Sequence, residues 1–172
     1  LDSLRAAHDR EAGFGPAQHG RVERAATEVV DRNRGADLNR NVRRFPVPDE
    51  FSDIEAAPLL CGGMIGFRAL KIAGEGERLG LYGFGASAQI LCHIAAGQGL
   101  RVFAFTKPGD EDGQRFAISL GAEWAGDSGD RPPEPLDAAI VFAPVGPLMI
   151  DALRASDRGA RIVSAGIHMS DI

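Results

Sequence analysis

The sequence predicts an α/β fold in which an arginine-rich N-terminal segment precedes a doubly wound parallel sheet of about five strands. A glycine-punctuated turn, Gly83 to Ala88, stands between a short apolar run and an alanine-rich segment. From this turn onward, apolar runs alternate with segments of helical periodicity. The charge balance also changes: residues 1–45 hold nine Arg, no Lys and seven acids, whereas the remainder holds ten basic and seventeen acidic side chains. We therefore divide the chain into an unassigned segment, 1–44, and a folded domain, 45–172.

Composition excludes several classes of function. The net charge of -5 argues against a general affinity for nucleic acid. No apolar run approaches the roughly 20 residues that span a bilayer, so neither a membrane nor a nucleic acid is an expected partner. Two cysteines without a Cys-x-x-Cys pair provide neither a disulfide framework nor a structural metal site. The first residues resemble neither a secretory signal nor a translation start, so we expect a cytoplasmic piece of a longer protein.

The segment 1–44 has helix-like periodicity over 2–10 and 20–32, with a Gly- and Pro-containing breaker between them. An arginine-rich helix can bind RNA or an acidic partner. The alternative, a solvated or partly disordered segment, is favoured because the apolar side chains here are small and few.

Order is expected from Phe45 onward. Prolines hold residues 45–48 extended, and Ser52 with Glu55 forms a capping-box pattern that predicts a helix over 53–60. After an interruption at 61–63, helical spacing resumes over 64–73 and ends at Gly74.

The rest of the chain alternates strand and helix. Strands are expected over 79–82, 101–106, 123–125, 138–142 and 161–165, and helices over 87–96, 110–120 and 147–155. Strands separated by helices of this length form a parallel sheet covered on both faces, with right-handed crossovers. The predicted strand order is 3-2-1-4-5, which places a ligand at the carboxyl ends of the first and fourth strands.

The glycine turn suits a dinucleotide. Gly83 lets the chain reverse, Gly85 lets a pyrophosphate approach the backbone, and small Ala88 lets the helix lie against the strand. Backbone N–H groups at the start of the helix then face the phosphates. The same short motif also occurs in ordinary strand-to-helix turns, so alone it does not decide the function.

Several segments together resemble the cofactor domain of the medium-chain dehydrogenase/reductase superfamily, and within it the zinc-type alcohol dehydrogenases. The resemblance covers about Pro46 to Ile172 and rests on the segments 55–61, 83–88, 119–122 and 164–169. It implies a Rossmann-type fold and hydride transfer between NAD(P) and an alcohol or aldehyde. It also implies a homo-oligomer in the full-length enzyme. The family usually has Gly where this chain has Ala86 and Ala88, a departure that weakens phosphate binding modestly at most.

The motif and the resemblance assign eleven cofactor-binding residues: Gly83, Phe84, Gly85, Ala86, Ser87, Thr106, Lys107, Ala143, Pro144, Gly166 and Ile167. Thr106 and Lys107 stand where an NAD enzyme carries an acid that binds the ribose hydroxyls. A hydroxyl and an ammonium there favour the 2′-phosphate of NADP. In the alternative, Lys107 is only solvated, and other contacts hold NAD.

The resemblance places Cys61 at the third catalytic zinc ligand of the parent family. One cysteine holds no zinc, since a catalytic site needs three protein ligands, and residues 1–44 contain no Cys. For this chain we therefore expect Cys61 to be a buried, small apolar residue, like Cys92 in its helix. His168 either caps a strand end or donates to a ribose or substrate, and the first role is favoured.

The resemblance thus implies an oxidoreductase of the zinc-type alcohol dehydrogenase family, with this chain supplying mainly the cofactor-binding domain and no complete catalytic site. In that mechanism, zinc polarises the substrate oxygen. Because the sixth strand of the family is also missing, we expect a truncated product. Two alternatives stay open: an inactive nucleotide-binding fragment, and a zinc-independent quinone or enoyl reductase relative.

Overall fold

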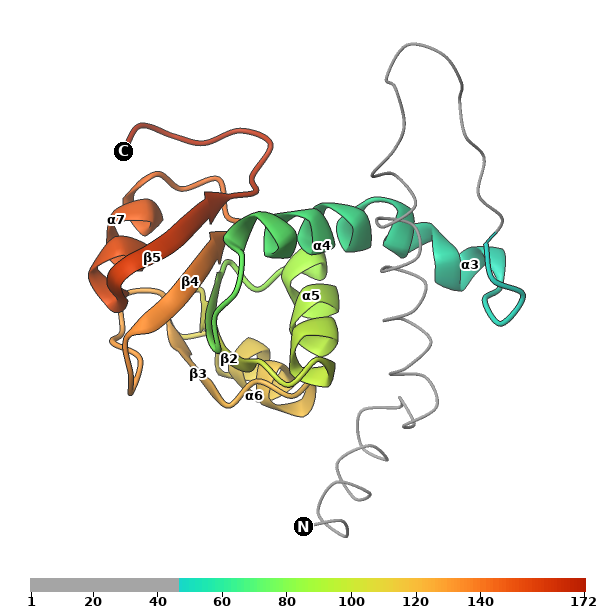
Figure 1. The fold of residues 1–172 in the computed structure, drawn as a ribbon, viewed down its shortest axis with the longest axis horizontal. Helices are drawn as coiled ribbons and strands as arrows, with labels where there is room; N and C mark the ends of the chain where they lie inside the picture. The colour runs from blue at the N-terminus through green and yellow to red at the C-terminus, as the bar shows by residue number, and fades with distance from the viewer. Residues whose placement is uncertain (1–46) are drawn as a thin grey trace, which may run out of the picture.

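The structure, a computed structural model, describes residues 47–172. The helices expected within 1–44, and the choice between a binding helix and a solvated segment, lie outside the described residues. Figure 1 shows the remainder of the chain, which is organised around one sheet.

The sheet has five strands in the order β3-β2-β1-β4-β5, as predicted. All four neighbouring pairs are parallel. The strands are β1 (Arg78–Tyr82), β2 (Arg101–Thr106), β3 (Trp124–Asp127), β4 (Leu136–Val141) and β5 (Ser156–Ser164). The order reverses between β1 and β4, so the carboxyl ends of these two strands lie on either side of the switch point.

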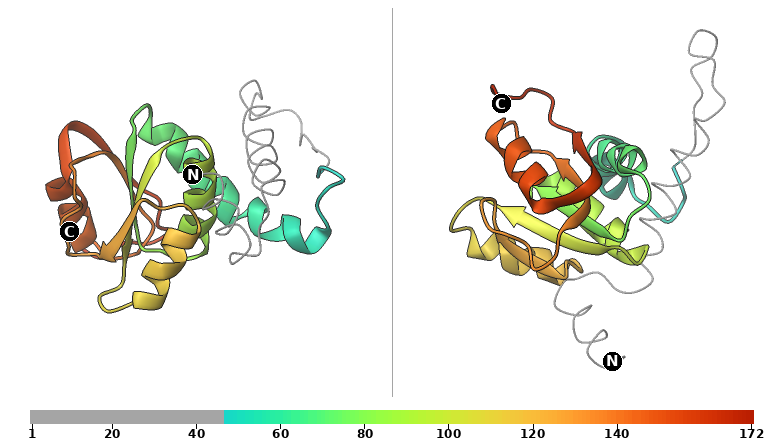
Figure 2. Two further views of the ribbon diagram at one scale, coloured as in Figure 1. Left: turned by 90° about the horizontal axis from the view of Figure 1, so that it is seen from below. Right: turned by 60° about the vertical axis from the view of Figure 1, so that its left-hand side comes forward.

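Helices cover both faces of the sheet, which confirms the doubly wound architecture (Figures 1 and 2). They are α4 (Gly62–Ala73), α5 (Ala86–Gly97), α6 (Glu111–Ser119) and α7 (Pro147–Ala155). The first three share a core with one face of the sheet through Leu79, Leu81 and their neighbours. On the other face, α7 packs over Tyr82, Phe105 and the aromatic side chains around them.

The first helix divides in two at a proline. Ser52 and Glu55 form the predicted capping box at the start of α3 (Asp53–Ala56), and the chain then tightens into the 3-10 helix η2 (Ala57–Leu60). Pro58 explains the change, because its ring clashes with the carbonyl group four residues earlier in an α-helix. Within the described residues no single helix is long and apolar enough to cross a membrane. By length and composition, only the pair Asp53–Leu60 and Gly62–Ala73, bent by 41°, would be long and apolar enough when taken together.

The edge strand β5 is longer than predicted. Its pairing with β4 shifts register between Leu136, which lies opposite Ser156, and Ala138, which lies opposite Arg161. The residues between these partners on β5 are mostly polar and exposed, so their sequence lacks the apolar alternation that marks a strand. Similarly, β3 runs to Asp127, two residues beyond the end of the predicted strand over 123–125.

Candidate functional site

The turn after β1 is the structural centre of the site. Gly83 has φ of 85°, and its N–H donates to the carbonyl oxygen of Phe105 at 3.0 Å. A Cβ placed on Gly83 would lie 2.7 Å from Cβ of Ala143 and 2.8 Å from its backbone nitrogen. Glycine is therefore required here both by the backbone conformation and by the close approach of the chain that leaves β4.

Gly85 differs from Gly83 in what surrounds it. Its φ of -87° suits any residue, yet a Cβ built on it would meet nothing within 4 Å. The space beside Gly85 is part of an open cleft, so the backbone here is accessible to a ligand. This is the arrangement that close approach of a pyrophosphate requires.

The start of α5 faces the same space. Gly85 is the N-cap residue of this 12-residue helix, and no side chain within residues 47–172 caps its first turn. The helix is held against the sheet by Ala88, which is fully buried, and the side-chain amide of Gln89 donates to the carbonyl oxygen of Phe84 at 3.2 Å. Backbone N–H groups at an uncapped helix start carry partial positive charge and bind anions.

The cleft lies at the carboxyl ends of β1 and β4 and has a volume of about 1190 Å³. All eleven residues predicted to bind cofactor line it, together with Cys61. The eleven cofactor-binding residues come from four places: the turn before α5 with the first residues of that helix, the end of β2 with Lys107, and the segments that follow β4 and β5. The topology thus brings together residues that are up to 84 positions apart in the sequence (Gly83 and Ile167).

Most of the cleft surface is apolar. One end is lined by Leu60, Met64 and Ile65 from η2 and α4, and Val145 and Ile167 complete this apolar region. Sequence reasoning did not assign the first three to the site, because helical spacing alone does not show that α4 begins beside the glycine turn. An apolar cleft with a few convergent polar groups is the usual form of a cofactor site.

The opposite end of the cleft lies beyond β2, where Thr106 and Lys107 border it. Lys107 is exposed, whereas Thr106 is only 1% exposed. The Thr106 hydroxyl accepts a hydrogen bond from the Gln114 amide at 3.2 Å. It also lies 3.3 Å from the carbonyl oxygens of Lys107 and Gly126 and donates to one of them. The hydroxyl that the sequence offered to a 2′-phosphate is therefore already engaged within the protein.

The chain is similar in sequence to known alcohol dehydrogenases. It is 50% identical over 128 residues to the probable alcohol dehydrogenase AdhA of Mycobacterium tuberculosis, a match that covers 73% of this chain and 36% of that protein. An alcohol dehydrogenase of Geobacillus stearothermophilus is 29% identical over 136 residues, covering 73% of this chain and 40% of that protein. The chain is a homologue of the alcohol dehydrogenases.

The chain also resembles solved structures in fold. The quinone oxidoreductase of Thermus thermophilus, whose structure was determined alone and in complex with NADPH, matches with a TM-score of 0.58 and 26% identity, over 69% of this chain and 41% of that one. No protein-family model matches the chain. The chain spans only 36% and 40% of the lengths of the two alcohol dehydrogenases above.

The two cysteines of this chain lie in opposite environments. Cys92 is fully buried in α5, and burial raises the pKa of its thiol to about 12, as expected for a core residue. The expectation that Cys61 is buried is wrong: its side chain is exposed. The residue occupies the N-cap position of α4, where the break between η2 and α4 turns it toward the cleft and away from the core.

The described residues do not by themselves form a zinc site. A catalytic zinc needs three protein ligands. Within 47–172, no group of three His, Cys, Asp or Glu side chains is placed to hold a metal ion. Cys61 and His168 both line the cleft, and His168 is exposed in the segment after β5. Among the described residues, these two side chains have no third ligand that would complete a metal site with them.

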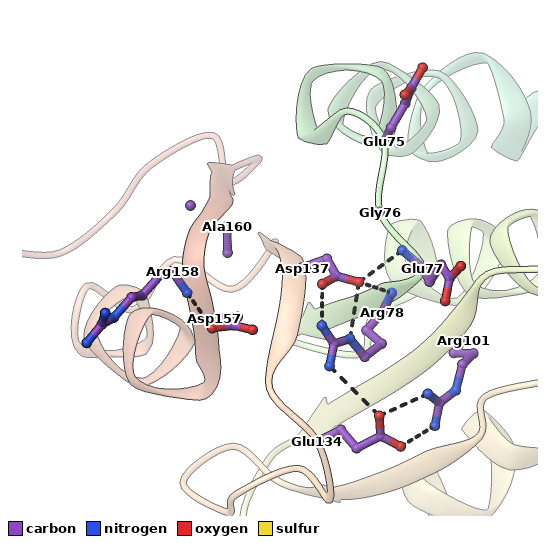
Figure 3. A pocket seen from close by; sticks show the side chains of 11 residues that line it. Glu75, Gly76, Glu77, Arg78, Arg101, Glu134, Asp137, Asp157, Arg158 and Ala160 are labelled. Carbon is purple, nitrogen blue, oxygen red and sulfur yellow. Dashed lines mark hydrogen bonds and ion pairs between the residues drawn. The ribbon is translucent and has the colours of Figure 1, made fainter.

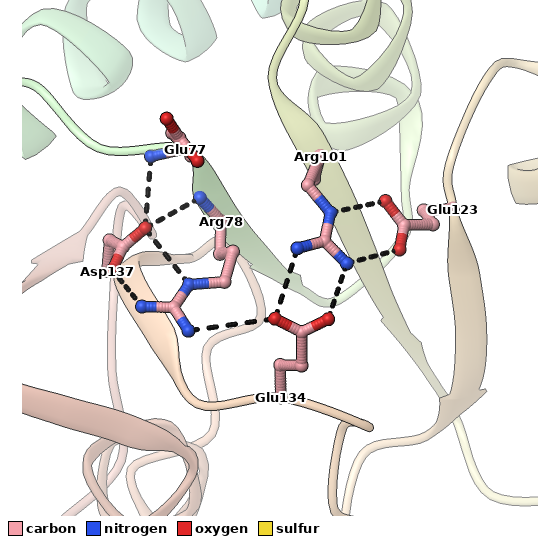
Figure 4. A network of polar contacts seen from close by, with 6 residues as sticks. All are labelled: Glu77, Arg78, Arg101, Glu123, Glu134 and Asp137. Atoms are coloured by element: carbon pink, nitrogen blue, oxygen red, sulfur yellow. Dashed lines mark hydrogen bonds and ion pairs between the residues drawn. The ribbon is translucent and has the colours of Figure 1, made fainter.

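A second group of charged residues lies at the amino ends of the strands (Figures 3 and 4), whereas the cleft lies at the carboxyl ends. Arg78 and Arg101 begin β1 and β2 and are register partners. Like charges at such close range require compensation. Figure 4 shows the Glu134 carboxylate between the two guanidinium groups. Its oxygens lie 2.7 Å from Arg101 Nη2 and 3.8 Å from Arg78 Nη1.

Each arginine also has a carboxylate of its own. Arg78 binds Asp137 through two side-chain bonds of 3.2 and 2.5 Å, and Arg101 binds Glu123 through two bonds of 2.7 and 2.6 Å. Hydrogen bonds from the Arg78 side chain hold the pKa of Asp137 at about 2, and backbone N–H groups of Arg78 and Glu77 add to this effect. Arg101 likewise lowers the pKa of Glu123 and of Glu134.

We call these five residues, Arg78, Arg101, Glu123, Glu134 and Asp137, the strand-start network. Most of them border a polar hollow of about 550 Å³ (Figure 3). Because their charges are paired with one another, the geometry gives the network a structural role: it ties together the beginnings of β1, β2 and β4 and the approach to β3. Sequence reasoning missed it, although an arginine at the first position of two adjacent strands is a usable signal.

Proposed function

We propose that the cleft binds the dinucleotide NAD(P), and that residues 47–172 act as the cofactor-binding part of an NAD(P)-dependent alcohol dehydrogenase. The observation that carries the proposal is the uncapped start of α5, which opens from the glycine turn into a cleft at the switch point between β1 and β4. Homology to alcohol dehydrogenases supports the same assignment.

The chain fits the cofactor in three respects. The space beside Gly85 admits a pyrophosphate to the backbone, and the N–H groups at the start of α5 offer it donors. The apolar surface around Met64, Val145 and Ile167 is suited to the face of an aromatic ring. At the other end, Lys107 brings a positive charge to the ribose side.

NAD(P) supplies or accepts the hydride when it is bound. The residues of this chain then have three tasks: to hold the phosphates at α5, to orient the nicotinamide ring against the segments after β4 and β5, and to exclude water with the apolar surface. Ala143, Pro144, Gly166 and Ile167 line the place where these two segments meet the cleft. The proposed substrate is an alcohol or an aldehyde, the class on which the homologues' name rests.

We propose NADP as the preferred form of the cofactor. Among the described residues that line the cleft, Lys107 is the one lysine or arginine. The quinone oxidoreductase of similar fold was determined in complex with NADPH. Thr106 contributes to this preference only indirectly, because its hydroxyl is bound within the protein.

Zinc chemistry requires ligands beyond those of residues 47–172, since Cys61 alone does not constitute a site. In the favoured proposal, such ligands come from outside this range, and Cys61 is one ligand of the complete site. A zinc-independent quinone or enoyl reductase is the second candidate, favoured by the similarity to the quinone oxidoreductase. Replacing Cys61 by Ser in a full-length homologue separates the two, because only the zinc enzyme loses metal and activity.

The proposal is tested with the purified 172-residue chain. NADPH is titrated by its fluorescence, and turnover of primary and secondary alcohols is followed by NADPH absorbance, with and without added zinc. We expect binding of NADPH without alcohol oxidation, because the described residues hold no substrate-activating group. Measurable turnover would contradict the inactive-fragment alternative, and absence of NADPH and NADH binding would overturn the proposed function.

A further inference from the structure

The segment that presents Lys107 to the cleft is a tight turn, Lys107 to Asp110. The N–H of Asp110 donates to the carbonyl oxygen of Lys107 at 3.0 Å, and Gly109 has φ of 77°. Pro108 at the second position and a glycine with positive φ at the third are the pattern of a type II turn. Asp110 then caps α6, since its carboxylate accepts from the N–H of Gly113 at 2.9 Å. Both ends of the turn are therefore fixed.

The middle of this turn is held from the neighbouring strand. Asp127, the last residue of β3 and the register partner of Thr106, accepts two hydrogen bonds through its Oδ1 atom. One comes from the N–H of Gly109 at 3.0 Å, and the other from the Gln114 amide at 2.8 Å. The same Gln114 nitrogen lies 3.2 Å from the Thr106 hydroxyl. A single carboxylate oxygen thus connects β3, the turn and α6.

The loop after β3 is held in a similar way. The N–H of Asp127 donates to the Asp130 carboxylate at 3.0 Å, and the N–H of Asp130 donates back to the Asp127 carbonyl oxygen at 2.9 Å. Ser128 lies inside this small loop and lines the cleft on the same side as Lys107. The position of Asp127 therefore determines where both the turn with Lys107 and the loop with Ser128 lie at this end of the cleft.

We propose that Asp127 is a positioning residue for cofactor selection: by holding Gly109 and Gln114 it fixes Lys107 at the cleft and sets the preference for a 2′-phosphorylated dinucleotide. This inference rests on the proposed function, because it assumes that the adenosine ribose lies between Lys107 and Ser128. It assigns selection to a side chain that does not line the cleft.

The charges around the turn explain why position matters. The acids nearby are Asp110, which lines the cleft, and Asp127 and Asp130 behind it. A 2′-phosphate is attracted by the Lys107 ammonium and repelled by these carboxylates. When Lys107 is held at the cleft, the attraction dominates at short range. When the turn is loosened by the loss of the Asp127 side chain, Lys107 moves into solvent while the carboxylates of Asp110 and Asp130 remain, so the preference shifts toward the unphosphorylated nucleotide.

The experiment measures the Kd of NADPH and of NADH for the full 172-residue chain by nucleotide fluorescence and titration calorimetry. Asp127→Ala removes the acceptor that holds Gly109 and Gln114. We expect the preference for NADPH over NADH to fall about tenfold, mainly through weaker NADPH binding. Asp127→Asn retains Oδ1 as an acceptor for both donors and loses only the charge. It should keep the preference within about threefold of the wild type or increase it.

Two further variants complete the set. Asp112→Ala is the matched control, because it removes an exposed acid of α6 that pairs only with Arg115 among its contacts in the described structure, and it should leave the preference unchanged. Gln114→Leu removes the second donor to Asp127 and should lower the preference by less than Asp127→Ala. Far-UV circular dichroism and the Tm identify any unfolded variant, and Gln114→Leu decides the question if Asp127→Ala does not fold.

Lys107→Met distinguishes the inference from the proposed function. If Lys107→Met abolishes the preference for NADPH but neither Asp127→Ala nor Gln114→Leu changes it, the role of Asp127 is overturned and the NADP site stands. If Lys107→Met has no effect on the preference, both the NADP assignment and the inference are overturned. If the wild type binds neither nucleotide, the proposed function itself fails.

Discussion

The two ends of the parallel sheet are built in opposite ways. At the amino ends of the strands, the strand-start network pairs each arginine with two carboxylates, so that its charges are compensated within the protein. At the carboxyl ends of β1 and β4, an uncapped helix start and an accessible Gly85 border a mostly apolar cleft. The first end stabilises the fold, and the second keeps donors available for a ligand.

One sheet thus serves both purposes. Unsatisfied backbone groups cost stability, so they are tolerated where a ligand supplies the missing partner. Fixing the strands at their other end provides a rigid support for such a site. If this account is correct, substitutions at the amino end should change stability without changing nucleotide affinity, and substitutions in the cleft should do the reverse unless they disturb the backbone.

Gly83→Ala should have the largest effect, because it disturbs both. The new methyl group overlaps Ala143, and φ of 85° is strained for alanine. We expect a loss of about 3 kcal/mol in the free energy of unfolding, measured in urea, and loss of NADPH binding. Gly129→Ala is the control, since its Cβ meets nothing within 4 Å and its φ is not positive. Equal stability of the two variants would contradict the structure of the turn.

Asp137→Asn should weaken the strand-start network and leave the cleft unchanged. It removes the carboxylate that binds Arg78 through two hydrogen bonds and leaves only the longer contact to Glu134, so we expect a loss of about 1 to 2 kcal/mol at neutral pH and an unchanged Kd for NADPH. The exposed Asp112→Asn, on α6, should cost less than about 0.5 kcal/mol. A change of NADPH affinity as large as that in stability would show that the two ends are not independent.

The lowered pKa of Asp137 predicts that the stability of the wild type depends on pH. In the folded chain the pKa of Asp137 is lowered from 3.8 to about 2, so its contribution is complete above about pH 4 and is lost as the pH falls toward 2. Glu123 and Glu134, whose pKa values are also lowered, act in the same direction. The Tm of the wild type should therefore fall more steeply between pH 4 and pH 2 than that of Asp137→Asn. Parallel curves would contradict this assignment.

Gly85→Ala should do the reverse: it should weaken nucleotide binding and leave stability unchanged. Its backbone conformation suits alanine and its Cβ meets no protein atom, so the Tm should stay within about 1 °C of the wild type. The methyl group projects toward the place where the phosphates approach, and NADPH affinity should fall about tenfold. Unchanged affinity would place the pyrophosphate elsewhere.

Cys61→Ser should have the smallest effect. The side chain is exposed, so stability should change by less than about 0.5 kcal/mol and NADPH affinity should not change. In the native wild type, an aromatic disulfide reagent at pH 8 should label Cys61 quickly and Cys92 only after unfolding, because Cys92 is buried and its pKa is raised to about 12. Rapid labelling of two thiols would contradict the burial of α5.

Much of this architecture is predictable from the sequence because local patterns and topology agree. The glycine turn, the alternation of strands and helices, and the positions just after strand ends were sufficient to predict the strand order. The eleven residues that the motif and the resemblance assigned to the cofactor all line one cleft. The carboxyl ends of parallel strands meet at one edge, so residues distant in the chain converge there.

What the sequence did not reveal depends on side chains that meet across elements. The bond of Asp127 to Gly109 joins β3 to a turn 18 residues away, and the strand-start network joins residues up to 59 apart. The engagement of the Thr106 hydroxyl by Gln114 follows from the same convergence. The exposure of Cys61 depends on the break between η2 and α4, which no propensity for a buried thiol could reveal.

The most direct test of the proposed cofactor site is a titration of the ¹⁵N-labelled chain with NADPH, followed by NMR. The account predicts that the largest shifts occur in the backbone amides of residues 83–88 and of the segments after β4 and β5. The Nε signals of Arg78 and Arg101 at the amino end should stay in place. Shifts concentrated on those two arginines, or an unchanged spectrum at millimolar NADPH, would contradict it.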